Sequence, residues 1–172
     1  SPILNYRKTH LYFCDKLWSQ DSPGFTTLEI KNTHGQSIKC ALAICMDINA
    51  KDFTSGEYEL ADFMVKEKVE AFLFLTNWTD SEPDSNDEQK SLLNIYNYWL
   101  HRLRPILEAK KQILFLCADR VGKEYSFFDK KDVWFFGGSC ALMINPIYLI
   151  QNLGKRKEGY LMVEAKVPDV KN

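Results

Sequence analysis

Three stretches of the chain are apolar on both alternating faces, which is the pattern of strands buried inside a sheet. Ser37 to Cys45 is the clearest, because the positions facing each way are almost all apolar. Ala71 to Leu75 and Gln112 to Cys117 repeat the pattern over shorter lengths. The hydrophobic pattern therefore predicts a sheet that is covered on both sides.

The segments between these strands have apolar residues at helical spacing. Glu57 to Val69 carries an apolar stripe at helical spacing, and a second stripe runs from Leu92 to Leu107. Pro105 is expected to bend the second helix. The order strand, helix, strand, helix, strand predicts an α/β fold without an internal domain boundary.

Shorter patterns complete the expected elements. A hairpin is predicted from Phe25 to Cys45, with its turn at Asn32 to Gly35, and a polar loop from Asn77 to Glu88. Gly137-Gly138 is expected to form a turn or bulge. Further strands are expected at Tyr12–Cys14, Val133–Phe136, Ala141–Ile144 and Gly159–Val163.

Composition excludes several classes of protein. The 172 residues carry 22 basic and 23 acidic side chains, so no basic surface for nucleic acid is expected. The longest apolar run, Cys40 to Met46, is too short to cross a membrane. The five cysteines form no C-x-x-C pair, which favours reduced thiols and a cytoplasmic protein. No metal-binding or phosphate-binding motif is present, so neither a metal nor another cofactor is expected.

Cys45 is the strongest candidate for chemistry. It ends a buried strand and is followed by a polar turn, and active sites of open α/β sheets gather at the carboxyl ends of strands. The backbone N–H of Met46 would then point at a developing oxyanion. A thiol nucleophile also needs a base or a cation that favours the thiolate. His34 and His101 are expected at the surface, so lysine is the residue type that remains as an activator.

Lys8 and Cys45 lie in two motifs that resemble those of one known family. Tyr6-Arg7-Lys8-Thr9-His10-Leu11 and Ile44-Cys45-Met46-Asp47 are similar to the lysine and cysteine motifs of the nitrilase, or carbon–nitrogen hydrolase, superfamily. Three later stretches also resemble the family in the same order: Leu75–Trp78, Cys117–Gly122 and Phe136–Cys140. The resemblance covers nearly the whole chain.

The resemblance implies a four-layer α-β-β-α sandwich and a catalytic triad of Glu, Lys and Cys. The family's glutamate precedes its lysine, whereas none of the seven residues before Lys8 is Glu. We therefore expect residues 1–172 to be the C-terminal part of one such domain, with the N-terminal part of the fold as its partner. Members of the superfamily also often pair, so an oligomer is possible.

Within the superfamily, the Cys45 motif looks most like that of fungal amidases of the N-degron pathway. Those enzymes remove the side-chain amide of N-terminal Asn or Gln through a thioester, so the implied partner is a protein or peptide with a free N-terminus. Asn77 and Trp78 are expected to line the substrate pocket, and Asp80, in the acidic loop, to bind the substrate's α-amino group. Two alternatives stay open: a hydrolase of small amides or nitriles, and a binding module without catalysis.

Overall fold

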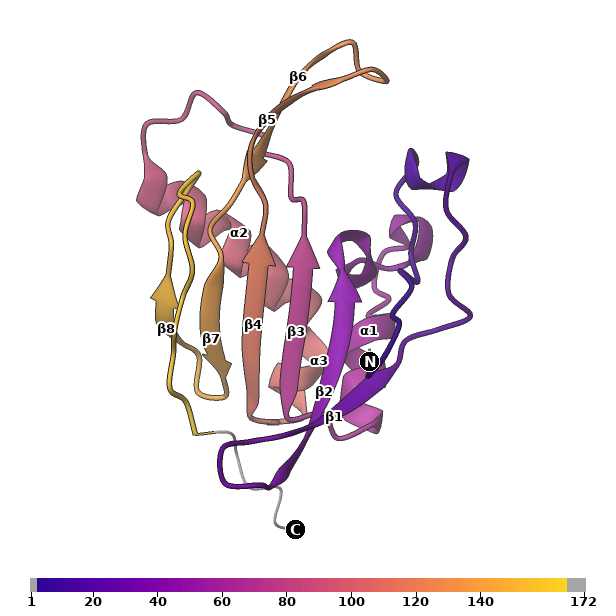
Figure 1. Cartoon of the computed structure of the whole chain (residues 1–172), viewed down its shortest axis with the longest axis vertical. Coiled ribbons are helices and arrows are strands. Elements are labelled where there is room, and N and C mark those ends of the chain that lie inside the picture. Colours follow the sequence, from indigo (N-terminus) through magenta and orange to yellow (C-terminus); the bar gives the residue numbers. More distant parts are fainter. Residues whose placement is uncertain (1–2, 167–172) are drawn as a thin grey trace.

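The computed structural model describes residues 3–166 and is built around one mixed sheet (Figure 1). Its six strands lie in the order β1-β2-β3-β4-β7-β8. Strands β2, β3 and β4 run parallel to one another, and the remaining neighbours are antiparallel. The strands are β1 (Thr27–Lys31), β2 (Ser37–Ile44), β3 (Ala71–Thr76), β4 (Ile113–Asp119), β7 (Cys140–Ile144) and β8 (Tyr148–Asn152). The three parallel strands therefore direct their carboxyl ends to a single edge.

A separate two-stranded ribbon rises beyond that edge. It consists of β5 (Val121–Ser126) and β6 (Lys131–Phe136), paired antiparallel from Val121 opposite Phe136 to Ser126 opposite Lys131. The segment before β1 rises at the same end of the sheet and contains the short helix η1 (Asp15–Leu17). Figure 1 shows these two arms flanking the carboxyl ends of the parallel strands.

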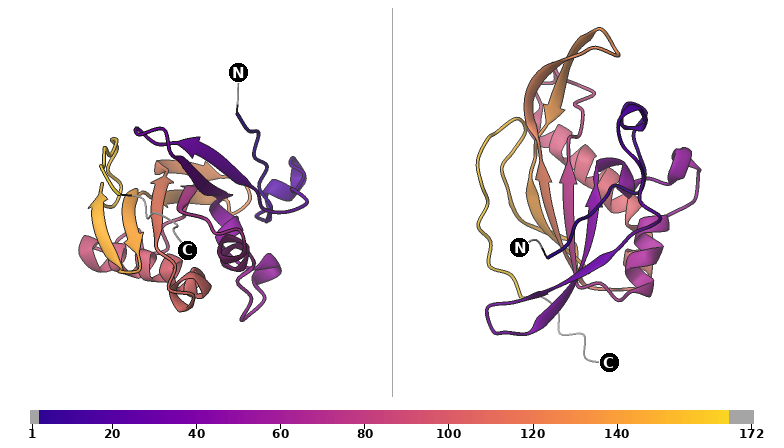
Figure 2. Two further views of the ribbon diagram at one scale, coloured as in Figure 1. Left: turned by 90° about the horizontal axis from the view of Figure 1, so that it is seen from below. Right: turned by 45° about the vertical axis from the view of Figure 1, so that its right-hand side comes forward.

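The helices α1 (Glu59–Lys66), α2 (Glu88–Arg102) and α3 (Arg104–Glu108) all cover the same face of the sheet (Figure 2). Phe72, Phe74 and Phe115 project from the sheet into this layer. There Phe74 and Phe115 contact the fully buried ring of Trp99 from α2. This aromatic layer fixes the helices against the strands and holds the parallel strands in place.

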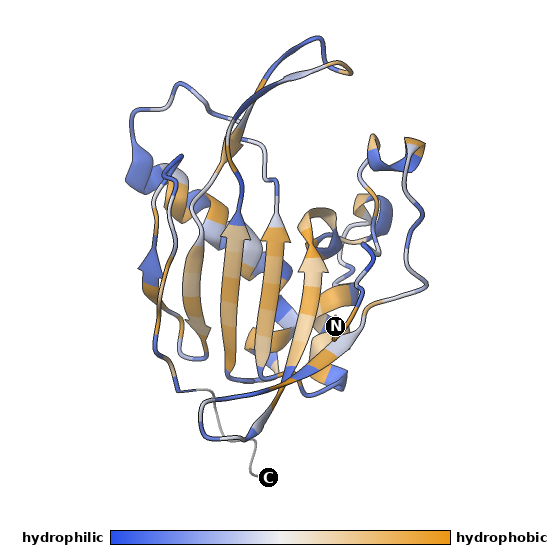
Figure 3. Ribbon diagram, in the orientation of Figure 1, coloured by the Kyte–Doolittle hydropathy of each residue, from blue (hydrophilic) through white to orange (hydrophobic). Residues whose placement is uncertain are grey.

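The opposite face of the sheet is also apolar, but no helix covers it within residues 3–166 (Figure 3). Ala71, Leu114 and Met143 form a small cluster there with partly buried neighbours that include Ala165 of the C-terminal segment. Leu75, on β3, is 56% exposed on this face. Helices therefore cover one face of the sheet, and the prediction of a sheet covered on both sides is confirmed for that face only.

Most of the predicted elements are present, with small shifts at their ends. The hairpin turn at Asn32 to Gly35, the polar loop from Asn77 to Glu88 and the α/β order are confirmed. Gly137 and Gly138 both have positive φ, and a Cβ at Gly137 would lie 2.6 Å from Val121, so this turn requires glycine. Pro105 does more than bend the second helix, because α2 ends at Arg102 and α3 begins at Arg104.

Two predicted strands are wrong. Tyr12–Cys14 forms a turn that leads into η1, and Gly159–Val163 is irregular backbone without a strand partner. Two strands were not predicted, namely β5 and β8, both of which carry mostly exposed side chains. None of the helices in residues 3–166 is long and apolar enough to span a membrane.

Candidate active site

A large cavity opens where β2, β3 and β4 end. Its walls come from the two arms, and its volume is about 1340 Å³. Cys45, Thr76 and Asp119 line it from the ends of the three strands. Phe13 of the N-terminal arm meets Phe128 of the ribbon across the top, with ring centroids 5.8 Å apart. The cavity thus lies where an α/β sheet places its chemistry.

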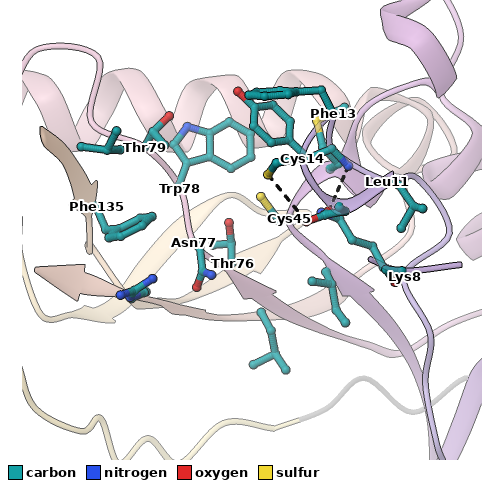
Figure 4. A pocket seen from close by; sticks show the side chains of 18 of the residues that line it. Lys8, Leu11, Phe13, Cys14, Cys45, Thr76, Asn77, Trp78, Thr79 and Phe135 are labelled. Atoms are coloured by element: carbon teal, nitrogen blue, oxygen red, sulfur yellow. Dashed lines mark hydrogen bonds and ion pairs between the residues drawn. The ribbon is translucent and has the colours of Figure 1, made fainter. Parts of the chain in front are cut away.

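Cys45 lies in this cavity, as predicted (Figure 4). It follows β2 directly and begins the short helix η2 (Cys45–Ile48) with φ of 48°. A positive φ is uncommon for a residue with a side chain, and such strained positions cluster at functional sites. Met46, also at the cavity, comes next in the first turn of η2, where backbone N–H groups lack helical acceptors. The turn therefore presents a thiol with a candidate oxyanion donor beside it.

Asp47 connects the turn at Cys45 to the segment that carries Lys8. Its side chain is completely buried. Oδ1 accepts hydrogen bonds from the backbone N–H groups of Thr9 and His10, at 2.8 and 2.7 Å. Oδ2 accepts from the backbone N–H of Ile44 at 2.8 Å and from the Tyr6 hydroxyl at 2.7 Å. Burial and the Asp47 charge raise the pKa of Tyr6, so Tyr6 keeps its proton and stays a donor.

Lys8 lines the same cavity as Cys45, as the sequence motifs implied. Its Nζ donates to Oδ2 of Asp15 at 2.5 Å, and the same oxygen accepts the backbone N–H of Tyr12 at 3.0 Å. Both members of this ion pair are largely shielded from solvent. Asp15 was not among the predicted site residues, because a lysine and an aspartate seven residues apart form no recognisable motif.

Neither exposed histidine approaches the thiol. His34 and His101 lie on the surface, as predicted. His10 is buried, but its Nδ1 faces the carbonyl oxygen of Asn49 at 2.8 Å and its Nε2 lies 3.3 Å from Glu59. Lys8 lines the cavity together with Cys45, whereas none of the three histidines lines it.

Asn77 and Trp78 line the cavity from the loop after β3, where they were expected. Trp78 is half-buried, and its ring packs on Tyr98 and Trp99 of α2 at 5.5 and 5.8 Å. The ring thus belongs both to the cavity wall and to the edge of the core. Tyr98 in turn donates to Oδ1 of Asn49 at 2.5 Å, which fixes the end of η2.

Asp80 does not lie in the cavity, in contrast to the expectation. Its carboxylate is buried and pairs with Lys155 at 3.0 Å and Arg156 at 2.7 Å. Burial raises the pKa of Asp80, but the hydrogen bonds from Lys155 and Arg156 outweigh it and hold the pKa below its usual range. Asp80 therefore anchors the acidic loop to the C-terminal segment, because both basic partners come from the stretch after β8.

The other cysteines differ from Cys45 in their surroundings. Cys40, Cys117 and Cys140 are buried in the sheet. Burial raises the pKa of Cys40 to about 11 and raises the pKa of Cys117 as well, which disfavours a thiolate at either position. Cys14 lines the cavity, and its pKa is raised too, mainly by burial and to a smaller extent by the nearby charge of Asp15.

Among residues 3–166, no group of three or more His, Cys, Asp or Glu side chains could hold a metal ion.

The chain is similar to known proteins in sequence and in fold. The chain is 28% identical over 157 residues to protein N-terminal amidase of Schizosaccharomyces pombe, covering 83% of this chain and 52% of that protein. A crystal structure of N-terminal amidase with a Gln-Val peptide superposes with a TM-score of 0.67 at 16% identity, over 90% of this chain and 69% of that one. A carbon–nitrogen hydrolase from Helicobacter pylori G27 gives 0.61 at 21% identity, over 89% and 48%.

The chain has the carbon–nitrogen hydrolase fold. No family model matches the sequence, so the assignment rests on the structure and on the curated relative. The described residues form one six-stranded sheet with one layer of helices and a separate two-stranded ribbon, and the chain spans about half the length of the curated relative. Of the expected α-β-β-α architecture, the described residues form an α-β half, and the apolar face of its six-stranded sheet that lacks helices is open.

Asp47→Ala is expected to lower the free energy of unfolding by at least about 3 kcal/mol, because four donors lose their acceptor and three of them are backbone N–H groups. Chemical denaturation of the complete protein measures this. The exposed Asp62, in the first turn of α1, is the matched control, and Asp62→Ala should change stability by less than about 0.5 kcal/mol. Equal stability of the two variants would contradict the anchoring role of Asp47.

Proposed function

We propose that this chain carries the Cys and Lys of an amidohydrolase that removes the side-chain amide of N-terminal Asn or Gln. The observation that carries the proposal is the pairing of the two motifs: Asp47 fixes the Lys8 segment to the Cys45 turn inside one cavity. The curated relative is named protein N-terminal amidase, and the solved N-terminal amidase was crystallised with Gln-Val and Asn-Glu peptides.

The proposed reaction is nucleophilic catalysis through a thioester. The thiolate of Cys45 attacks the carboxamide carbon, while Lys8 and the Met46 N–H stabilise the oxyanion. A glutamate acts as general base, taking the thiol proton and giving it to the leaving ammonia. The same glutamate then activates the water that hydrolyses the thioester. Lysine suits its position because its compact charge favours the thiolate and also meets the oxyanion.

That glutamate has no counterpart before Lys8 in residues 1–172. We therefore propose that these residues form the C-terminal part of one hydrolase domain, whose other part supplies the glutamate and covers the open face of the sheet. Two observations support this: the chain spans 52% of its curated relative, and Leu75 is 56% exposed on an otherwise apolar face.

The cavity favours a peptide over a small amide. Its aromatic walls, with Phe13 and Phe128 at the rim, extend well beyond Cys45 and leave space for residues that follow the first. A substrate with a chain attached to the reacting residue would use this space, whereas a free small amide would not.

The test is deamidation of short peptides by the complete protein, followed by mass spectrometry and ammonia release. Peptides that begin with Asn or Gln should be converted to the corresponding acids, and peptides with the same residue at an internal position should not. Comparable turnover of simple aliphatic amides or nitriles would favour the small-substrate alternative. Binding of the peptides without turnover would favour a non-catalytic module.

A further inference from the structure

Four carboxyl groups line the cavity, and one of them has a buried oxygen without a partner. Asp15 pairs with Lys8, Glu124 pairs with Arg120 at 2.6 Å, and Asp129 accepts from the Ser126 hydroxyl at 2.8 Å. Asp119 differs from these three because one of its carboxyl oxygens is buried and has no hydrogen-bond partner, and none of the basic side chains in residues 3–166 pairs with it. Asp119 is the last residue of β4, and its neighbours there determine which group it can bind.

Asp119 is 8% exposed, and only one of its two carboxyl oxygens is used. Oδ1 accepts the backbone N–H of Trp78 at 2.9 Å, which holds the loop that carries Asn77 and Trp78. Oδ2 is buried without a hydrogen-bond partner. Thr76 lies directly opposite Asp119 in the register of β3 and β4, and its buried Oγ1 also lacks a partner. Two residues that line the cavity and pair across β3 and β4 therefore each carry a buried oxygen that has no hydrogen-bond partner.

The sheet also sets the distance from these oxygens to the thiol. Ile44 pairs with Leu75 and Leu75 with Ala118, so the residues that follow, Cys45, Thr76 and Asp119, form one row across the edge. Adjacent strands lie about 4.8 Å apart, which separates the main chains at Cys45 and Asp119 by about 10 Å. In an N-terminal Asn, three bonds join the amide carbon to the α-nitrogen. The distance of about 10 Å is spanned by the side chains of Cys45 and Asp119, by these three bonds of the substrate, and by a hydrogen bond of about 2.8 Å.

We propose that Asp119, with the hydroxyl of Thr76 beside it, binds the α-ammonium group of the substrate. The inference rests on the proposed function and assigns a residue to the part of the substrate that distinguishes an N-terminal amide from an internal one. An ammonium group is a donor with a positive charge, and both features match a buried carboxyl group that has a free oxygen. Burial raises the pKa of Asp119 to about 8 within the chain, and a bound ammonium would supply the missing counter-charge.

The experiment compares two peptides that differ only at the α-amino group, Asn-Gly with a free and with an acetylated N-terminus. Wild-type complete protein should prefer the free peptide in kcat/KM. Asp119→Asn keeps an acceptor for the Trp78 N–H but removes the negative charge. It should lower kcat/KM for the free peptide roughly 10- to 100-fold and leave the acetylated peptide almost unchanged. Glu124→Gln, the matched control at a lining carboxylate already paired with Arg120, should keep the wild-type preference.

Calorimetric binding of both peptides to Cys45→Ser, with and without Asp119→Asn, gives the same comparison without turnover. An equal loss for the two peptides in Asp119→Asn would overturn the inference, because a residue that only supports the Trp78 loop affects both alike. An unchanged preference for the free amine would also overturn it, and the proposed function would stand. Absence of both turnover and binding in the wild-type protein would overturn the proposed function itself, and this inference with it.

Discussion

Replacing Cys45 with serine is expected to lower kcat for deamidation of an N-terminal Asn peptide by at least ~10³-fold, the scale seen when one member of a catalytic triad is removed. The reason is positional as well as chemical. Cys45 has positive φ at the end of β2 and lines the cavity together with Lys8. Serine keeps the shape of the side chain, so the loss should come without a loss of folded protein. Steady-state kinetics and a thermal unfolding midpoint measure the two effects.

Three other cysteines provide controls for this prediction. Cys117→Ser and Cys140→Ser alter buried thiols behind the cavity, and Cys14→Ser alters a thiol that lines it. Each variant should keep kcat within about tenfold of wild type, provided that it folds. A loss at Cys14 as large as that at Cys45, in a folded variant, would assign the nucleophile to the N-terminal arm instead.

Residues 1–172 expressed alone are expected to show no amidase activity and poor solubility. No glutamate precedes Lys8 in this stretch, and the sheet exposes apolar side chains such as Leu75 on one face. Exposed apolar patches of this kind promote association, and unprotected strand edges add to the hazard. Size-exclusion chromatography and the peptide assay, run beside the complete protein, measure both properties. A soluble and active monomer of residues 1–172 would contradict the proposal that they form part of a larger domain.

The central sheet could be predicted from sequence because its strands are apolar on both faces. β2, β3 and β4 stand out for this reason, and their common edge led directly to Cys45. β8 was missed because most of its side chains are exposed at the edge of the sheet, where no strong hydrophobic pattern is required. Gly159–Val163 has strand-like composition, but a strand also needs a hydrogen-bonded neighbour, and sequence alone does not supply that information.

The site was predictable where residues are close in sequence to the strand ends and unpredictable where distant segments meet. Cys45, Met46, Asn77 and Trp78 all follow strand ends directly and all line the cavity. Asp80 follows the same strand, but Lys155 and Arg156 return beside it and neutralise it, a contact across more than seventy residues.

Asp47 and Asp119 are residues whose positions were visible in the sequence but whose contacts were not. Asp47 lies two residues after Cys45 in the recognised motif, so its position was visible, but its four donors come largely from a segment 37 to 41 residues earlier. Asp119 lies in Cys117–Gly122, one of the stretches that resemble the carbon–nitrogen hydrolases, so its position was also visible. Burial and the unpartnered Oδ2, which give it a role, become visible only in the folded chain.

The proposed reaction requires that Cys45 forms a thioester with the substrate's side-chain acyl group. The most direct measurement is mass spectrometry of the complete protein quenched in acid during turnover of an N-terminal Gln peptide, followed by digestion. An acyl adduct is expected on the fragment that contains Cys45 in the wild-type protein, and no adduct is expected in Cys45→Ser. An adduct on a fragment that contains another cysteine, or steady turnover by Cys45→Ser at the wild-type rate, would contradict it.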